Sequence, residues 1–338
     1  MPYDSYTQRG TAPSYTSGAN GANALINEDV MSEIVKGVTH DSAALNLFKT
    51  RNMGTAQTRI PCLSAKPTAY FVSGDTGLKQ TSNVSWENKF LDAEELAVII
   101  PIPEKLLDDA SYDLWAEIEP EITEALAIAL DSAIFWGINA PSSWPTSIRS
   151  KCIDGTTLNE VQIGDSAIDV ADDINNVMAA VEADGFDVTA FWMANTMKAV
   201  LRGLRDDNNG LLFQPYTQGV EGTTFKGTLY SEPVHVSMSG VFQAQVAASL
   251  SNPVRLIAGD WSQGLIGVRQ DITAKLLTEA SLHDNAGNLM FNLPQQDMVA
   301  MRFVSRYAWQ VPNPLNRVNS SSTTRYPFAV LQSASSAV

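Results

Sequence analysis

One long stretch of alternating apolar residues limits what this chain can fold into. Between residues 84 and 102 a series of apolar side chains shares one parity, the spacing of a β-strand: Val84, Trp86, Phe90, Leu96, Val98, Ile100 and Ile102. The polar residues on that face, Asn88, Asp92 and Glu94, fall in its middle. A second strand-like segment spans about 56–72, and turn-forming residues 73–77 separate the two. Together they predict one long β-hairpin whose arms each reach roughly 55 Å at about 3.3 Å per residue.

A hairpin of that length needs a partner. Typical strands have about 5–6 residues, and an isolated two-stranded ribbon is barely stable in water. The outer part of the hairpin is therefore expected to lie on another molecule, most economically a second copy of the same chain. The residues expected to make these contacts between subunits are Tyr70, Phe71, Lys79, Trp86 and Phe90.

Other periodic segments predict helices and further strands. Apolar residues at helical spacing over 113–136 predict a helix of about 36 Å, which Gly137 ends and which bends at Pro120, because proline removes one backbone hydrogen bond. Pro101 and Pro103 end the strand before it. Further helices are expected at 27–40, 165–183 and from 195, and strands at 188–193, 234–238, 254–258, 265–268, 272–277, 298–304 and 309–311. Residues 1–25 and the segment after 313 are largely polar.

Composition excludes several classes of function. The 22 Lys and Arg residues against 37 Asp and Glu residues give a net charge of −15, the wrong sign for binding phosphates or an anionic membrane. Two cysteines, Cys62 and Cys152, are too few for a disulfide scaffold or a cysteine-rich zinc site. The sequence has neither a signal-peptide pattern nor an apolar stretch long enough to cross a bilayer, so the cytoplasm is the expected compartment where the chain is made.

The sequence carries no recognisable catalytic or cofactor motif. The three histidines are dispersed without a metal-ligand spacing, and the glycine-rich phosphate-binding motifs are absent. Ser262 lacks the glycine spacing of a hydrolase nucleophile, and residues 206–210 fail the calcium-loop pattern, since Thr217 stands where a glutamate is needed. We therefore expect no enzyme, no cofactor and no metal site.

Several short sequence segments, in this order along the chain, resemble those of a known family. They are IPIPEKLLDDAS at 100–111, DSAIFWG at 131–137, LRDDNNG at 204–210, GTLYSEPV at 227–234, AGDWSQG at 258–264, VRQDI at 268–272 and MRFVSRYAW at 301–309. The combination resembles the major capsid proteins of tailed double-stranded DNA bacteriophages, which have the Hong Kong 97-type fold. The resemblance implies an α+β fold with an N-terminal arm and short helix over 1–54, and a β-hairpin extended loop over 55–98. It also implies a peripheral domain over 99–159 and 290–338 with a spine helix at 112–137, and an axial domain over 160–289.

The resemblance also implies the function. Such a protein would assemble with itself into hexamers and pentamers, forming an icosahedral shell around packaged DNA that it does not read by sequence. Its partners would be a separate scaffolding protein, a portal protein and a decoration protein, and it would assemble in the bacterial cytoplasm and end in the virion. No membrane takes part.

Two alternatives remain open from the sequence. An encapsulin-like compartment enclosing an enzyme would share the fold, although the long hairpin favours a phage. Some relatives cross-link the subunits of their shells covalently through a bond between a lysine and an asparagine, with a desolvated carboxylate as the base. Here Lys66, Lys79 or Lys89 would supply the amine and Asn313 or Asn316 the amide. Since surface lysines are usually only solvated, uncoupled subunits are the expectation.

Overall fold

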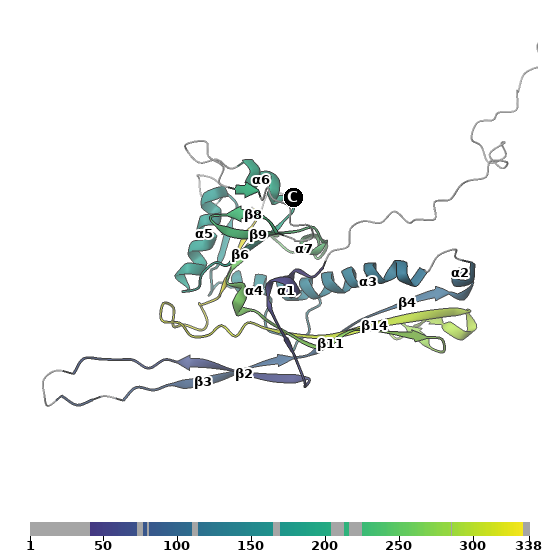
Figure 1. The fold of residues 1–338 in the computed structure, drawn as a ribbon, viewed down its shortest axis with the longest axis horizontal. Coiled ribbons are helices and arrows are strands. Elements are labelled where there is room, and N and C mark those ends of the chain that lie inside the picture. Colours follow the sequence, from purple (N-terminus) through teal and green to yellow (C-terminus); the bar gives the residue numbers. More distant parts are fainter. Residues whose placement is uncertain are drawn as a thin grey trace, which may run out of the picture. The chain divides into compact units, whose positions relative to one another are not determined.

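The computed structural model describes residues 41–72, 77–79, 81–109, 114–164, 170–203, 213–215, 225–284 and 286–333. These residues belong to one structural unit, Thr39–Asp109 with Asp113–Val338. The expected arm at 1–25, the helix at 27–40, most of the turn at 73–77 and the 204–210 segment lie outside the described residues. The described part is a mixed α+β structure with a four-stranded sheet, a seven-stranded sheet and two two-stranded sheets (Figure 1).

The four-stranded sheet has the order β1 (Lys49–Asn52), β11 (Leu265–Leu277), β14 (Met298–Gln310) and β4 (Glu94–Pro103). Strand β1 is parallel to β11, and the other pairs are antiparallel. The strands expected at 265–268 and 272–277 are one strand, as are those at 298–304 and 309–311. Shifts in the β11–β14 register between Val268 and Thr273 accommodate the polar interruption that had suggested two strands. Strand β4 ends at Pro103, as predicted, and its edge position tolerates proline.

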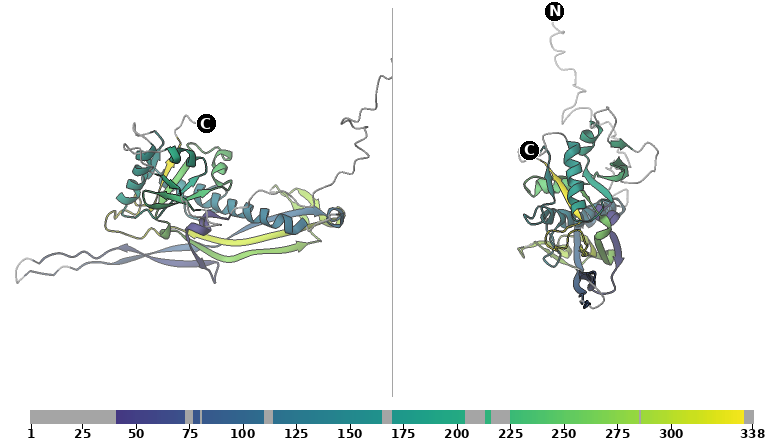
Figure 2. Two further views of the ribbon diagram at one scale, coloured as in Figure 1. Left: turned by 45° about the horizontal axis from the view of Figure 1, so that its top comes forward. Right: turned by 90° about the vertical axis from the view of Figure 1, so that its left-hand side faces the viewer.

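The predicted long helix is confirmed. Helix α3 (Leu114–Asp131) contains Pro120 and continues as a π-helical turn, η2 (Ser132–Trp136), before Gly137 ends it with a φ of 75°. Ile122 and Leu126 of α3 pack with Phe303 of β14, so the helix covers the four-stranded sheet (Figure 2). The π-helical turn was not predicted, because one extra residue in a turn leaves the apolar spacing almost unchanged.

The seven-stranded sheet has the order β5, β15, β10, β6, β9, β8, β7. Their bounds are Glu160–Gln162, Phe328–Gln332, Val254–Gly259, Ala190–Ala194, Glu232–Ser237, Phe225–Leu229 and Phe213–Pro215. Strand β15 is fully buried and pairs with β5 and β10. Strand β15, which the sequence grouped with 99–159, thus pairs with two strands of the 160–289 segment. The polar residues that precede β15 had obscured this short apolar strand.

The predicted hairpin is shorter and less continuous than the alternation suggested. Strand β2 (Gln57–Ala65) pairs with β3 (Ser85–Asp92) as a separate two-stranded sheet (Figure 1). The alternation continues through Ala93, but the amide of Ala93 donates to Ala56 O and closes this ladder, after which β4 pairs with β14 instead. Residues 66–72 and 81–84 are not in strands, so Tyr70 and Phe71 lie in the connection between β2 and β3. At about 3.3 Å per residue, the paired part of each arm spans roughly 30 Å.

The remaining elements are short. They are α1 (Ala43–Leu47), α2 (Glu104–Asp109), α4 (Ile148–Cys152), α5 (Val170–Ala183), α6 (Met197–Gly203), α7 (Val241–Ala247), β12 (Ser281–His283), β13 (Leu289–Asn292), η3 (Trp261–Gln263) and η4 (Leu293–Gln295). The helices expected at 165–183 and from 195 correspond to α5 and α6, and residues 165–169 lie outside the described part.

An aromatic core joins the two large sheets. The rings of Phe135 in η2 and Trp192 in β6 stack with centroids 4.2 Å apart, and Trp136 Nε1 donates to Val241 O at 2.9 Å. The same cluster contains Trp309 of β14 and Phe328 of β15. Because the end of the long helix is buried in a core shared by both sheets, the helix and the two sheets stabilise one another.

Candidate functional site

Exposed apolar side chains gather on the hairpin and its connection. Phe71 is 104% exposed, Leu78 is 91% exposed and Trp86 is 68% exposed, while Phe90 and Tyr70 are also exposed. Lys79 is exposed beside Leu78. The five residues predicted to contact another subunit are therefore all on the surface of the single chain, and Leu78 is a further member of this set. Leu78 was missed because it follows the turn and belongs to no periodic pattern.

The parity of β3 explains why two large aromatic residues face water. Leu91 is only 1% exposed and packs with Met53 and Ala308, so the odd-numbered face of β3 turns toward the four-stranded sheet at its Asp92 end. Trp86 and Phe90 occupy the other face. The hairpin base is further fixed by Gln310 Nε2, which donates to Phe90 O at 3.0 Å. One face thus anchors the hairpin to its own chain, and the opposite face remains available.

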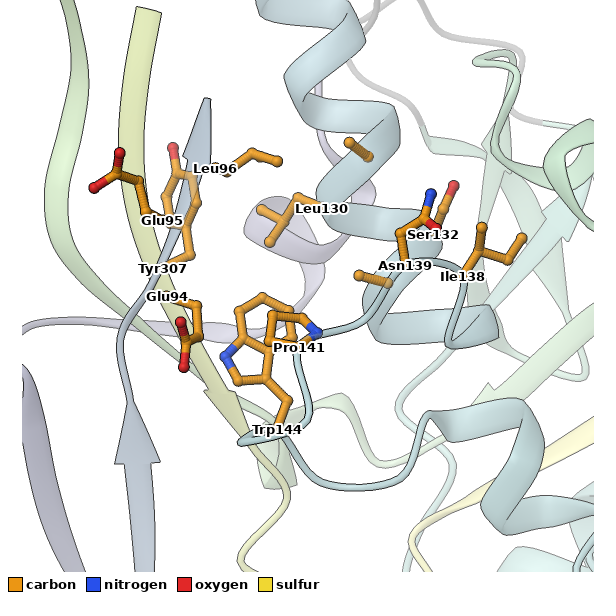
Figure 3. Close-up of a pocket in the computed structure, with 12 residues that line it drawn as sticks. Glu94, Glu95, Leu96, Leu130, Ser132, Ile138, Asn139, Pro141, Trp144 and Tyr307 are labelled. Atoms are coloured by element: carbon orange, nitrogen blue, oxygen red, sulfur yellow. The ribbon is translucent and has the colours of Figure 1, made fainter. Parts of the chain in front are cut away.

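A cavity of about 240 Å³ lies between the long helix, β4 and β14 (Figure 3). Glu94 and Glu95 of β4 lie opposite Leu130 of α3, and Trp144 forms part of the wall. The remaining lining residues are Leu96, Ala129, Ser132, Ala133, Ile138, Asn139, Pro141 and Tyr307. Trp144 Nε1 donates to Asp92 O at 3.1 Å, so this wall of the cavity is tied to the end of β3.

Two polar features of the cavity stand out. The Ser132 hydroxyl is buried and has no hydrogen-bond partner among the residues that the structure describes. Glu94 accepts a hydrogen bond from the Ser143 hydroxyl but has no ion pair within the described part of the chain, whereas Glu95 pairs with Arg306 at 2.8 Å. The cavity is therefore apolar inside, with an uncompensated carboxylate and an unpaired hydroxyl.

The candidate cross-linking residues all lie in the described part. Lys66 is half-buried, Lys79 is exposed, and Lys89 pairs with Glu87 at 2.7 Å. The amides of Asn313 and Asn316 both donate within their own chain, to Arg325 O at 2.7 Å and to Asp184 O at 2.6 Å.

One contact links the two segments that hold these candidates. Arg317 Nη2 donates to Pro67 O at 2.9 Å. This bond places the residues next to Lys66 and Asn316 side by side within one chain. Among the described residues, no hydrogen bond joins a candidate lysine to a candidate asparagine.

The segment before β15 is held by a buried polar network. The Asp184 carboxylate accepts from Asn159, from Asn319 and from the amide of Tyr326, at 2.7 to 2.9 Å. Arg325 is 2% exposed and donates to Asn313 and to Asn319 O. Burial lowers the pKa of the Arg325 guanidinium, and the charge of Asp184 acts in the opposite direction. The network fixes residues 313–326 against the seven-stranded sheet.

Within the described ranges there is no group of three or more His, Cys, Asp or Glu side chains arranged to hold a metal ion. The helices of the same ranges are all too short or too polar to cross a membrane. The exposed hairpin and the cavity, both suited to binding another protein, are thus the two candidate sites.

Comparison with known proteins decides which class of protein carries these surfaces. The sequence model of the phage capsid family matches residues 22–315. The chain belongs to the phage capsid family. It is 28% identical over 290 residues to the major capsid protein of Staphylococcus phage 80alpha, covering 85% of this chain and 81% of that protein.

Solved structures agree with this family assignment. The chain is 34% identical to a protein of Microbacterium phage Oxtober96, covering 93% of this chain and 98% of the other with a TM-score of 0.75. A protein of Mycobacterium phage Cain is 26% identical, with 94% and 98% covered and a TM-score of 0.76. The family consists of structural proteins of the virion capsid, and the comparisons favour a phage capsid over an encapsulin-like compartment.

Proposed function

We propose that this capsid protein forms hexamers and pentamers that close into an icosahedral shell around the double-stranded DNA genome of a tailed phage, in the Hong Kong 97-type arrangement. In this proposal 1–54 is the N-terminal arm, 55–98 the extended loop and 112–137 the spine helix. Residues 160–289, together with β15, form the axial domain. Assembly takes place in the bacterial cytoplasm, with a separate scaffolding protein, a portal protein and a decoration protein as partners.

The observation that carries the proposal is the exposed apolar face of the hairpin. Burying a large apolar side chain contributes about 1.5–3 kcal/mol, so Phe71, Leu78 and Trp86 together offer several kcal/mol to a neighbouring subunit. One such contact contributes little binding free energy, but in a closed shell each subunit makes it twice, once with its own hairpin and once with the hairpin of a neighbour. The contacts then add through multivalency.

The charge of the chain supports an enclosing role. A net charge of −15 repels phosphates, so packed DNA would not adhere to the wall, and no sequence-specific binding is expected. The subunits are expected to be joined without covalent bonds. Mature particles boiled in detergent should then run as one band at the monomer mass, 36.6 kDa.

Electron microscopy of the purified assembly tests the proposal directly. The expected result is closed particles with fivefold and sixfold clusters of subunits. Replacing Trp86 by Ser should weaken assembly, whereas the matched change Val246→Ser, at an exposed apolar residue of α7, should not. A chain that remains a stable monomer in the presence of its scaffolding protein, with Trp86 still open to solvent, would overturn the proposal.

A further inference from the structure

The cavity beside Trp144 has the chemistry of a receptor for an apolar side chain with a neighbouring positive charge. Its interior is formed by Leu96, Leu130 and Ile138, while the carboxylate of Glu94 has no ion pair within the described ranges (Figure 3). Water occupies roughly 30 Å³ per molecule in the liquid, so a cavity of about 240 Å³ has room for a whole side chain.

Exposed apolar residues with a basic neighbour include Leu106 beside Lys105, Leu276 beside Lys275 and Val318 beside Arg317, but Leu78 is the most exposed of them. Leu78 is 91% exposed and Lys79 follows it directly, so an apolar side chain and a cation project from the same short connection. Phe71 is more exposed, but none of its described neighbours, Ala69, Tyr70 and Val72, is basic. Charge complementarity with Glu94, together with the greater exposure of Leu78 and its place in the connection of the hairpin, favours the Leu78–Lys79 pair.

A chain cannot fill its own cavity with this segment. The cavity lies at the Asp92 end of β3, because Trp144 is bonded to Asp92 O, whereas Leu78 precedes the Ser85 end. The eight residues of β3 separate these ends by roughly 26 Å at about 3.3 Å per residue. The occupant must come from a second copy.

We propose that the Leu78–Lys79 segment of one subunit inserts into the Trp144 cavity of the next subunit, with Leu78 inside and Lys79 beside Glu94. This inference rests on the proposed function and names the receiving site on the neighbour. The contact joins two different surfaces of identical chains, so its repetition generates rings when the rotation closes. Trp144 is hydrogen-bonded to the end of β3, so each subunit carries the cavity at the base of its own hairpin. The connection of that same hairpin then fills the cavity of the next subunit.

Engineered cysteines test the contact in assembled shells. Leu78→Cys combined with Ser143→Cys, next to Glu94, should give a ladder of disulfide-linked subunits after mild oxidation with diamide. Both native cysteines are buried and should remain silent. The matched pair Leu78→Cys with Val200→Cys, on α6, should give no ladder. A Ser143→Cys thiol that is as reactive in the shell as in the free subunit would show an empty cavity and overturn the proposal.

Charge reversal supplies a second test that does not depend on the cysteine variants. Lys79→Glu and Glu94→Lys should each raise the subunit concentration needed for assembly, by about tenfold if each costs 1.4 kcal/mol per contact, and the double variant should restore it. Lys66→Glu combined with Glu94→Lys is the matched control and should not restore it.

The outcomes separate the two proposals. If wild-type chains form shells but neither the ladder nor the rescue is seen, the docking site is wrong and the shell function stands. If wild-type chains form no shells with their scaffolding protein, the proposed function fails and the docking site falls with it.

Discussion

Replacing Asp131 by Asn should alter how the stability of this chain depends on pH. Asp131 is the last residue of α3, and its carboxylate holds the first turn of α1. Ser42 Oγ donates to one carboxylate oxygen at 2.6 Å, and the amides of Ala43 and Ala44 donate at 2.8 and 3.1 Å. The side chain is 1% exposed, and burial raises its pKa from 3.8 to about 6, although these three hydrogen bonds oppose the rise.

The sign and size of this pH dependence follow from the linkage between protonation and folding. Between pH 3.8 and about 6 the folded chain binds a proton at Asp131 that the unfolded chain has lost. The free energy of unfolding therefore falls as the pH rises through this window, by about 1.4 kcal/mol per pH unit and about 3 kcal/mol in all. Above this pH window the decrease in the free energy of unfolding is complete and does not change further with pH. An asparagine does not titrate, so the variant should lack this contribution.

Denaturant unfolding of both chains from pH 4 to pH 7.5 measures the effect. The difference in unfolding free energy between wild type and Asp131→Asn should change with pH between about 4 and 6 and be flat above it. Ser42→Ala removes one hydrogen bond that lowers the pKa of Asp131, so the free energy of unfolding should continue to fall to a higher pH than in the wild type. Parallel pH curves for wild type and Asp131→Asn would refute the reasoning.

Three further substitutions have definite expected outcomes. Gly259→Ala would place a Cβ 2.4 Å from Pro327 O, a backbone atom, so soluble expression should be lost; a yield equal to wild type would contradict this. Trp136→Phe removes the bond to Val241 O and should lower the unfolding free energy by about 1–3 kcal/mol, measured by denaturant titration. Arg325→Met leaves buried carbonyls without donors and should expose residues 313–326 to limited proteolysis, whereas an unchanged digestion pattern would show that Asp184 alone holds this segment.

Local periodicity predicted the elements whose own neighbouring side chains carry a regular apolar pattern. The long helix was found because its apolar spacing reflects one buried face, which packs on Phe303. Trp86 and Phe90 could be assigned to one face of β3 from their spacing alone, and both are exposed. In both cases the residues that carry the signal are close in sequence.

The features that the sequence did not predict depend on contacts between segments that are far apart in the chain. The alternation resumes on the same parity beyond Asp92 and Glu94, yet β3 pairs with β2 while β4 pairs with β14, some two hundred residues away. Strand β15 is buried on both faces, so it lacks the alternation that identifies a half-exposed strand. The Trp144 cavity combines residues from β4, α3, the following loop and β14, and no spacing in the sequence brings these together.

The place of β15 between β5 and β10 has a consequence for the timing of synthesis. Until residue 332 has left the ribosome, β10 lacks one neighbour, and Phe328 is missing from the aromatic cluster that holds the long helix. A chain that lacks β15 therefore cannot complete the interior that the two sheets share. The core that fixes the end of the long helix therefore depends on a strand some two hundred residues farther along the chain.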